Sequence, residues 1–187
     1  MTPSTTLEAP LAPFSIPRGR LFPIIAGAAL IALCSGIEIP LRPVPITGQT
    51  FGVLYVAALL GPVQGTGAIL LYLAAGIAGL PVFSGGSFGL YQLLGPTGGY
   101  LIGFIAAAAI VGSLSGRRIG GIRLPRGIAM FLGMLAIYGF GLLRLSAFIG
   151  FERAFTHGVL PFLAGDLLKV FLASMLAPRQ PVSDPGR

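Results

Sequence analysis

Long apolar stretches, separated by short segments rich in Gly, Pro and Arg, dominate this chain. Six of them read as candidate membrane helices, and we expect these at residues 21–37, 51–60, 65–80, 97–114, 127–143 and 159–177. A helix that spans a bilayer needs about 20 residues, with a range of roughly 17–25. The second and third stretches are shorter, which leaves open an earlier start for either helix or a short hairpin buried against the others. The pattern predicts an all-α protein whose membrane domain covers residues 21–177.

The composition agrees with a membrane protein. Only 9% of the residues are charged and 55% are hydrophobic, and the mean hydropathy is +0.91, whereas a soluble domain has about 25% charged residues. The net charge of +7 comes from arginines in short segments, without a basic run interleaved with aromatic residues. We therefore expect the lipid bilayer, and not nucleic acid, as the surroundings of this protein.

The placement of arginine predicts an orientation in the membrane. With six spans both chain ends lie on one side, and that side collects eight arginines: 18, 20, 117, 118, 123, 126, 179 and 187. The opposite side holds three, at positions 42, 144 and 153. Positive loops face the cytoplasm, so residues 1–20 and 178–187 are predicted as cytoplasmic tails, the first disordered because of its prolines. Outer loops are expected at 38–49, 81–96 and 144–158.

Asp166 and Lys169, the latter the only lysine, interrupt the sixth apolar stretch. A charge at the centre of a membrane helix costs about 2.5–3.5 kcal/mol, and such residues usually mark a substrate or ion site. The spacing i, i+3 places both side chains on one helix face. A strong acceptor then lies beside a strong donor, which suits a small polar ligand with adjacent N–H and C=O groups. The alternative is an ion pair that only fixes the rotation of the helix.

The predicted outer loop 81–96 contributes further polar candidates. Ser84, Ser87, Tyr91 and Gln92 could contact a ligand there, and the glycines of this loop permit close approach of the backbone. An ordinary turn is the competing interpretation. Scattered phenylalanines, at positions 51, 83, 88 and 162, could form apolar walls, although phenylalanine in a membrane bundle is usually core.

Small residues recur along the first span. Ala28, Ala32 and Gly36 follow one another at i, i+4 and i+8. Such a face allows another helix to approach closely. It fits either packing within this chain or docking of a partner membrane protein.

Motifs of catalysis are missing from the chain. There is no Gly-Lys-Ser/Thr of a Walker A loop, no Gly-x-Ser-x-Gly and no His-Glu-x-x-His. A single Cys34 and a single His157 cannot build a cysteine- or histidine-rich metal centre. We expect no enzyme, no metal and no cofactor, and a binding or transport role instead.

Four segments together carry a family resemblance. They are PVPITGQTF at 43–51, GLPVFSGG at 79–86, LGPTGGYLIG at 94–103 and GVLPFLAGDLLK at 158–169. With them, the chain resembles the BioY family, the biotin-specific substrate-binding (S) components of energy-coupling factor (ECF) transporters, over about residues 21–177. The resemblance implies the S-component fold of six membrane helices, a bacterial cell membrane and capture of biotin from outside.

The resemblance also implies partners. A membrane-embedded ECF coupling protein would link the chain to a cytoplasmic ATPase pair, and the alanine-rich face of the first helix, with Ala28 and Ala32, would dock on it. A homo-oligomer is left open. Two other functions also remain: an S component for another vitamin or small amide, and a ligand-free structural membrane protein.

The family's Gly-Asp-x-x-Lys motif maps onto Gly165, Asp166 and Lys169. It implies that Asp166 accepts from a ureido N–H of biotin while Lys169 donates to the ureido C=O. Thr47 and Gln49 in the first outer loop would cover the ligand. No basic residue stands in 81–96 to meet the biotin carboxylate, for which Tyr91 and Gln92 are preferred over Tyr100 and Arg42.

Overall fold

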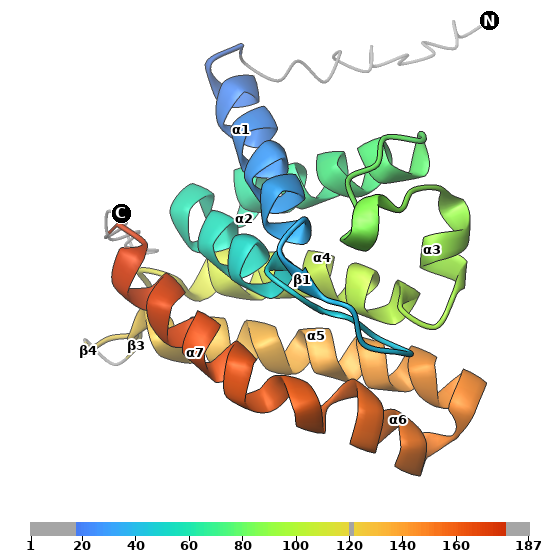
Figure 1. The fold of residues 1–187 in the computed structure, drawn as a ribbon. Coiled ribbons are helices and arrows are strands. Elements are labelled where there is room, and N and C mark those ends of the chain that lie inside the picture. The colour runs from blue at the N-terminus through green and yellow to red at the C-terminus, as the bar shows by residue number, and fades with distance from the viewer. Residues whose placement is uncertain (1–17, 120–121, 179–187) are drawn as a thin grey trace, which may run out of the picture.

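The structure is a computed structural model that describes residues 18–119 and 122–178, and these residues are mostly helical. Figure 1 shows the arrangement. The elements in chain order are α1 (Arg18–Ser35), β1 (Glu38–Ile39), β2 (Ile46–Thr47), α2 (Gln49–Ile77), the 3-10 helix η1 (Ser84–Gly86), α3 (Leu90–Leu94), α4 (Gly98–Leu114), β3 (Arg118–Ile119), β4 (Ile122–Arg123), α5 (Arg126–Ile149), α6 (Phe151–Gly158) and α7 (Leu160–Leu176). The predicted all-α class is confirmed. The chain ends, residues 1–17 and 179–187, lie outside the described residues, and α1 already begins within the predicted N-terminal tail.

The second and third predicted spans correspond to the two helical limbs of α2, which meet at a break near its middle. Gly61 has φ 77° and ψ −175°, and Pro62 follows it. A positive φ favours glycine, and proline cannot continue the hydrogen-bond ladder before it. The two limbs of α2 therefore run in different directions (Figure 1), and the break falls between the two spans expected from the sequence.

Close helix packing fixes the core. α2 packs against α1 and α4, α4 packs against α5, and α6 and α7 lie along α5. At Gly112 of α4 an added Cβ would lie 2.6 Å from the backbone N and Cα of Pro62, so α4 fits directly against the α2 break. Small residues allow such approach between membrane helices. The buried side chains between these helices include Ile31, Leu54, Met130, Met134 and Leu145.

Two of the described helices, α2 and α5, are long and apolar enough to cross a membrane by length and composition. The pair α6 and α7, bent by 42° at its junction, would form a third span that is broken, and α1 and α4 contribute shorter apolar helices. Large apolar side chains such as Phe22, Leu33 and Leu143 are exposed on the outside of this bundle. An apolar outer surface of this kind indicates contact with lipid.

The predicted outer loop 144–158 is wrong, because this segment is helical. α5 continues to Ile149, and α6 follows after Gly150, whose φ is 80°. The Arg144 guanidinium lies 5.1 Å from the ring centre of Phe148 and donates to the carbonyl of Leu94, so it stabilises the end of α5. The charged residues of this segment instead belong to helices, Arg144 to α5 and Glu152 and Arg153 to α6.

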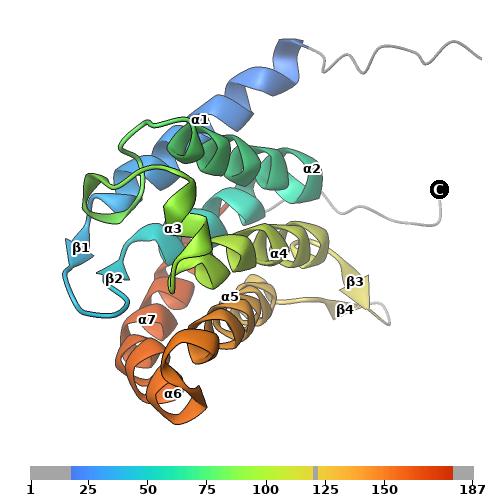
Figure 2. The ribbon, with the colours of Figure 1, turned by 90° about the vertical axis from the view of Figure 1, so that its right-hand side faces the viewer.

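The segments that connect the long helices lie at the two ends of the bundle. The β1–β2 hairpin, α3 and α6 gather at one end, and the β3–β4 hairpin lies at the other (Figure 2). In β1–β2 the register pairs Glu38 with Thr47 and Ile39 with Ile46, which leaves residues 40–45 as the turn. Thr47, whose carbonyl accepts from Lys169, lies at the hairpin end.

Candidate functional site

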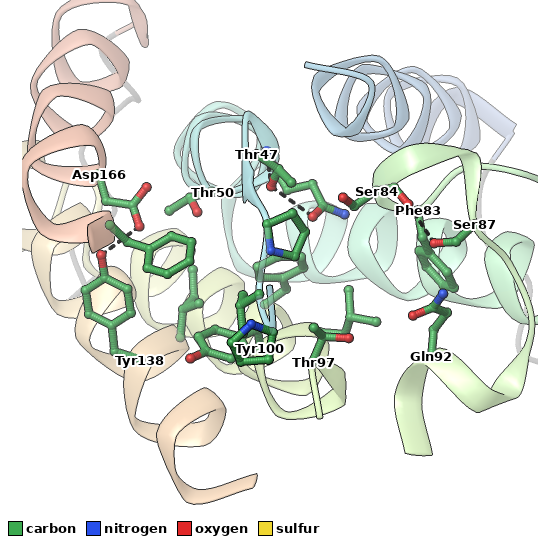
Figure 3. Close-up of a pocket in the computed structure, with 18 of the residues that line it drawn as sticks. Thr47, Thr50, Phe83, Ser84, Ser87, Gln92, Thr97, Tyr100, Tyr138 and Asp166 are labelled. Atoms are coloured by element: carbon green, nitrogen blue, oxygen red, sulfur yellow. Dashed lines mark hydrogen bonds between the residues drawn. The ribbon is translucent and has the colours of Figure 1, made fainter. Parts of the chain in front are cut away.

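A cavity of about 470 Å³ lies at the hairpin end. It has the size of a small-molecule site, since such pockets measure about 300–1,000 Å³. The side chains around it come from the hairpin, the start of α2, the segment 83–97, and helices α4, α5 and α7 (Figure 3). They are Arg42, Pro43, Val44, Pro45, Thr47, Gln49, Thr50, Phe83, Ser84, Ser87, Gln92, Thr97, Tyr100, Leu101, Phe104, Ile137, Tyr138, Phe162, Asp166 and Lys169.

Asp166 and Lys169 form the charged wall of this cavity. Lys169 Nζ lies 2.7 Å from Asp166 Oδ1, and the two side chains are 19% and 4% exposed. Lys169 also donates to the backbone carbonyl of Thr47 at 2.7 Å. On the other side, the Tyr138 hydroxyl donates to Asp166 Oδ2 at 2.7 Å. The ion pair therefore connects α7 with both the hairpin and α5.

This network fixes the pair without using its full hydrogen-bonding capacity. Each carboxylate oxygen of Asp166 has a further lone pair, and the Lys169 ammonium has one more N–H. Charge-assisted hydrogen bonds in a partly dried cavity are the stronger kind. The wall can thus accept from one ligand group and donate to a neighbouring one.

Gln49 lies buried where the hairpin enters α2. Its side-chain amide donates to the Tyr72 hydroxyl, and its Oε1 accepts from the Thr47 hydroxyl at 3.0 Å. These bonds hold the base of the hairpin against the bundle, directly beside the carbonyl that Lys169 contacts. The predicted residues Thr47 and Gln49 both line the cavity.

The segment 81–96 brings some of its predicted residues to the cavity and not others. Ser84 and Gln92 line it, and the Ser84 hydroxyl donates to the Glu38 carboxylate of β1. Tyr91 does not line it and is 64% exposed. The structure therefore does not bring Tyr91 together with the rest of the predicted site.

Apolar walls come from three aromatic side chains, Phe83, Phe104 and Phe162, all of them buried. The Phe83 ring meets the Tyr72 ring edge-on at 5.5 Å and fills the space beside Gly76. Of the other predicted wall residues, Phe51 stacks on Tyr55 and Phe88 is exposed, and neither lines the cavity.

Several lining residues were not singled out from the sequence. Tyr138 is the most consequential because it orients Asp166, and Thr50 and Thr97 add hydroxyls. The one available signal for Tyr138 was a phenol in the otherwise apolar stretch 127–143. Tyr100, considered from the sequence, lines the cavity and donates to the carbonyl of Gly158 at 2.8 Å.

The predicted docking residues of α1 do not share one environment. Ala28 is buried in the core of this chain, and Ala32 is partly buried against it. The outward face of α1 carries Ala29 and Leu33 instead. Ala28 therefore packs within the chain.

A helical membrane bundle with a ligand-sized cavity near one end, lined by both polar and apolar side chains, is the architecture of a small-molecule binding component. A model of the BioY family matches residues 12–183. The probable biotin transporter BioY of Pyrococcus horikoshii is 40% identical over 151 residues, which cover 81% of this chain and 89% of the relative. The biotin transporter BioY of Thermotoga maritima is 39% identical over 153 residues, with the same coverage. The chain belongs to the BioY family.

A solved structure agrees with this assignment. The crystal structure of the S-component for biotin from an ECF-type ABC transporter superposes with a TM-score of 0.73 at 27% sequence identity. The match covers 87% of this chain and 93% of that chain. The fold of this protein is therefore that of an ECF S component, embedded in the membrane, as the sequence resemblance implied.

Proposed function

We propose that this protein is a biotin-binding S component of an ECF transporter. The observation that carries the proposal is the Asp166–Lys169 pair in the wall of a ligand-sized cavity, held by Tyr138 and by the Thr47 carbonyl. Relatives named as biotin transporters, with about two fifths of their residues identical, support the choice of ligand.

In this proposal the ureido ring of biotin lies against the charged wall. Asp166 accepts from a ureido N–H, and Lys169 donates to the ureido C=O, both charge-assisted. The thiophane ring and the valeryl chain lie between Phe83, Phe104 and Phe162. Gln49, Ser84 and Gln92 supply further polar contacts around the ring and its chain.

The proposal also includes the transport of biotin into the cell. Both termini face the cytoplasm of a bacterial cell, and the cavity end of the bundle faces outward. The outer face of α1, next to Ala32, docks on a membrane-embedded coupling protein, and a cytoplasmic ATPase pair drives reorientation and release. The distribution of arginine supports the orientation, because positive segments stay in the cytoplasm.

Isothermal titration of the purified protein in detergent, with biotin and with thiamine as the control, tests the ligand. We expect saturable one-to-one binding of biotin and none of thiamine. Binding of thiamine instead would indicate an S component for another vitamin. Absence of binding by a well-folded sample would contradict the proposed function and favour a ligand-free structural role.

A further inference from the structure

Among the residues that the structure describes, Arg42 and Lys169 are the two basic residues that line the cavity. It stands in the turn of the β1–β2 hairpin, five residues before Thr47, whose carbonyl Lys169 contacts. Five residues span at most about 18 Å of extended chain. Arg42 lies in the turn of the hairpin and Thr47 at its base, and Pro43, Val44 and Pro45 between them also line the cavity.

Among the described residues that line the cavity, no acidic side chain is left to offset the positive charge of Arg42. Asp166 and Lys169 neutralise each other as an ion pair. Arg42 forms no ion pair or hydrogen bond with any residue in the described ranges 18–119 and 122–178. Glu38, the acid on the same hairpin, accepts from Ser84 instead. The cavity thus carries one net positive charge, that of Arg42.

A neighbouring cleft extends this positive region. Arg42 and Pro43 also line an open cleft together with Ile149, Arg153 and His157 from the α5–α6 end. Arg42 is exposed there, so its guanidinium stays hydrated before a ligand arrives and little desolvation is needed in advance. Positive groups at the mouth of a site also speed the encounter with an anionic ligand.

We propose that Arg42 is the partner of the ligand's carboxylate and selects an acid over its neutral amide. This inference rests on the proposed function, since it assumes that the ureido end occupies the Asp166–Lys169 wall. A guanidinium suits this role because it can bind a carboxylate through two parallel hydrogen bonds. Arg42 takes this role in place of Tyr91, which lies outside the cavity. Gln92 also lines the cavity, but its side chain carries no charge.

The test combines two ligands with four proteins. Dissociation constants for biotin and for its neutral primary amide, biotinamide, are measured with the wild-type protein, Arg42→Gln, Arg42→Lys and the control Arg117→Gln. Arg117 is exposed beside the β3–β4 hairpin at the opposite end, so the control makes the same charge change far from the cavity. We expect Arg42→Gln to weaken biotin binding about fivefold or more and to leave biotinamide binding within about twofold.

The other variants and ligands also test the role of Arg42. Arg42→Lys should keep part of the preference for the acid, and the control should keep all of it. Equal losses for both ligands with Arg42→Gln, no loss of biotin affinity, or equal affinity of the wild-type protein for acid and amide would each overturn the role of Arg42. Failure of the folded wild-type protein to bind either compound would overturn the proposed function itself, and with it the role of Arg42.

Discussion

Asp166 and Lys169 depend on each other because they are the two charged residues of the otherwise largely apolar helix α7. Removing one partner of a buried pair leaves the other uncompensated, which costs about 3–5 kcal/mol. We expect Lys169→Met to lower the free energy of unfolding by about this amount, since the Asp166 side chain is only 4% exposed. Asp166→Asn should cost less, because the Lys169 side chain is more exposed and still reaches the Thr47 carbonyl. Thermal unfolding in detergent measures both changes.

The double variant Asp166→Asn/Lys169→Met separates stability from binding. It leaves no lone charge, so it should regain most of the lost stability. Two charge-assisted hydrogen bonds, each about 1.5–3 kcal/mol, disappear from the ligand site, so biotin affinity should fall at least about a hundredfold. Glu152→Gln on the exposed side of α6 is the matched acid-to-amide control. Wild-type affinity in the double variant would mean that the pair is only structural.

Individual site residues could be predicted where polarity stands out against an apolar background. Asp166, Lys169, Gln49, Ser84 and Gln92, which are predicted to contact a ligand, all line the cavity. Neighbours in a helix point about 100° apart, so in the short helix α3 Gln92 faces the cavity while the adjacent Tyr91 faces away. The sequence alone does not show which of the two points inward. The link between Tyr138 and Asp166 was hidden for a similar reason, since it depends on how α5 and α7 pack.

At the level of elements, the broken helix α2 makes a close backbone contact with helix α4. We expect Gly112→Ala to destabilise the fold by about 1–3 kcal/mol, because the new methyl group would meet the backbone of Pro62 and overpack the contact. Thermal unfolding measures the change. Gly139→Ala in α5 is the control, since an added Cβ there meets no heavy atom within 4 Å and alanine favours a helix.

The control should leave stability unchanged or raise it. Equal melting temperatures of Gly112→Ala and Gly139→Ala would contradict the close α2–α4 contact. The result would then mean that the α2 break can move away from α4 at little cost.

Most helices could be predicted from apolar length alone, and the break in α2 from the Gly61–Pro62 interruption. α6 could not. Its sequence contains Glu152, Arg153 and His157, and the average polarity of the segment hides a helix with only Ala154 and Gly158 buried. Helix ends that lie near the membrane surface keep polar side chains in water while their backbone stays hydrogen-bonded, so polarity there does not indicate a loop.

At the scale of the whole molecule, the cavity lies at one end of the bundle. The hairpin end gathers the cavity, Arg42 and the Asp166–Lys169 wall, while α1 and α7 connect it to the opposite end. An S component needs a further surface for its partner, and the outward face of α1 offers small and apolar residues, Ala29 and Leu33 among them. Small residues let a partner helix approach closely.

We therefore expect Ala29→Arg to abolish co-purification with a co-expressed ECF coupling protein and ATPase pair, while biotin binding is retained. The arginine adds bulk and charge where the helices should touch, but it lies on the opposite side of α1 from its contact with α2. Ala109→Arg on the exposed face of α4 is the matched control, because it carries the same cost of placing arginine in a lipid-facing helix. Loss of the complex in both variants would indicate a general effect of the charge. Retention of the complex in Ala29→Arg would place the docking surface on another helix.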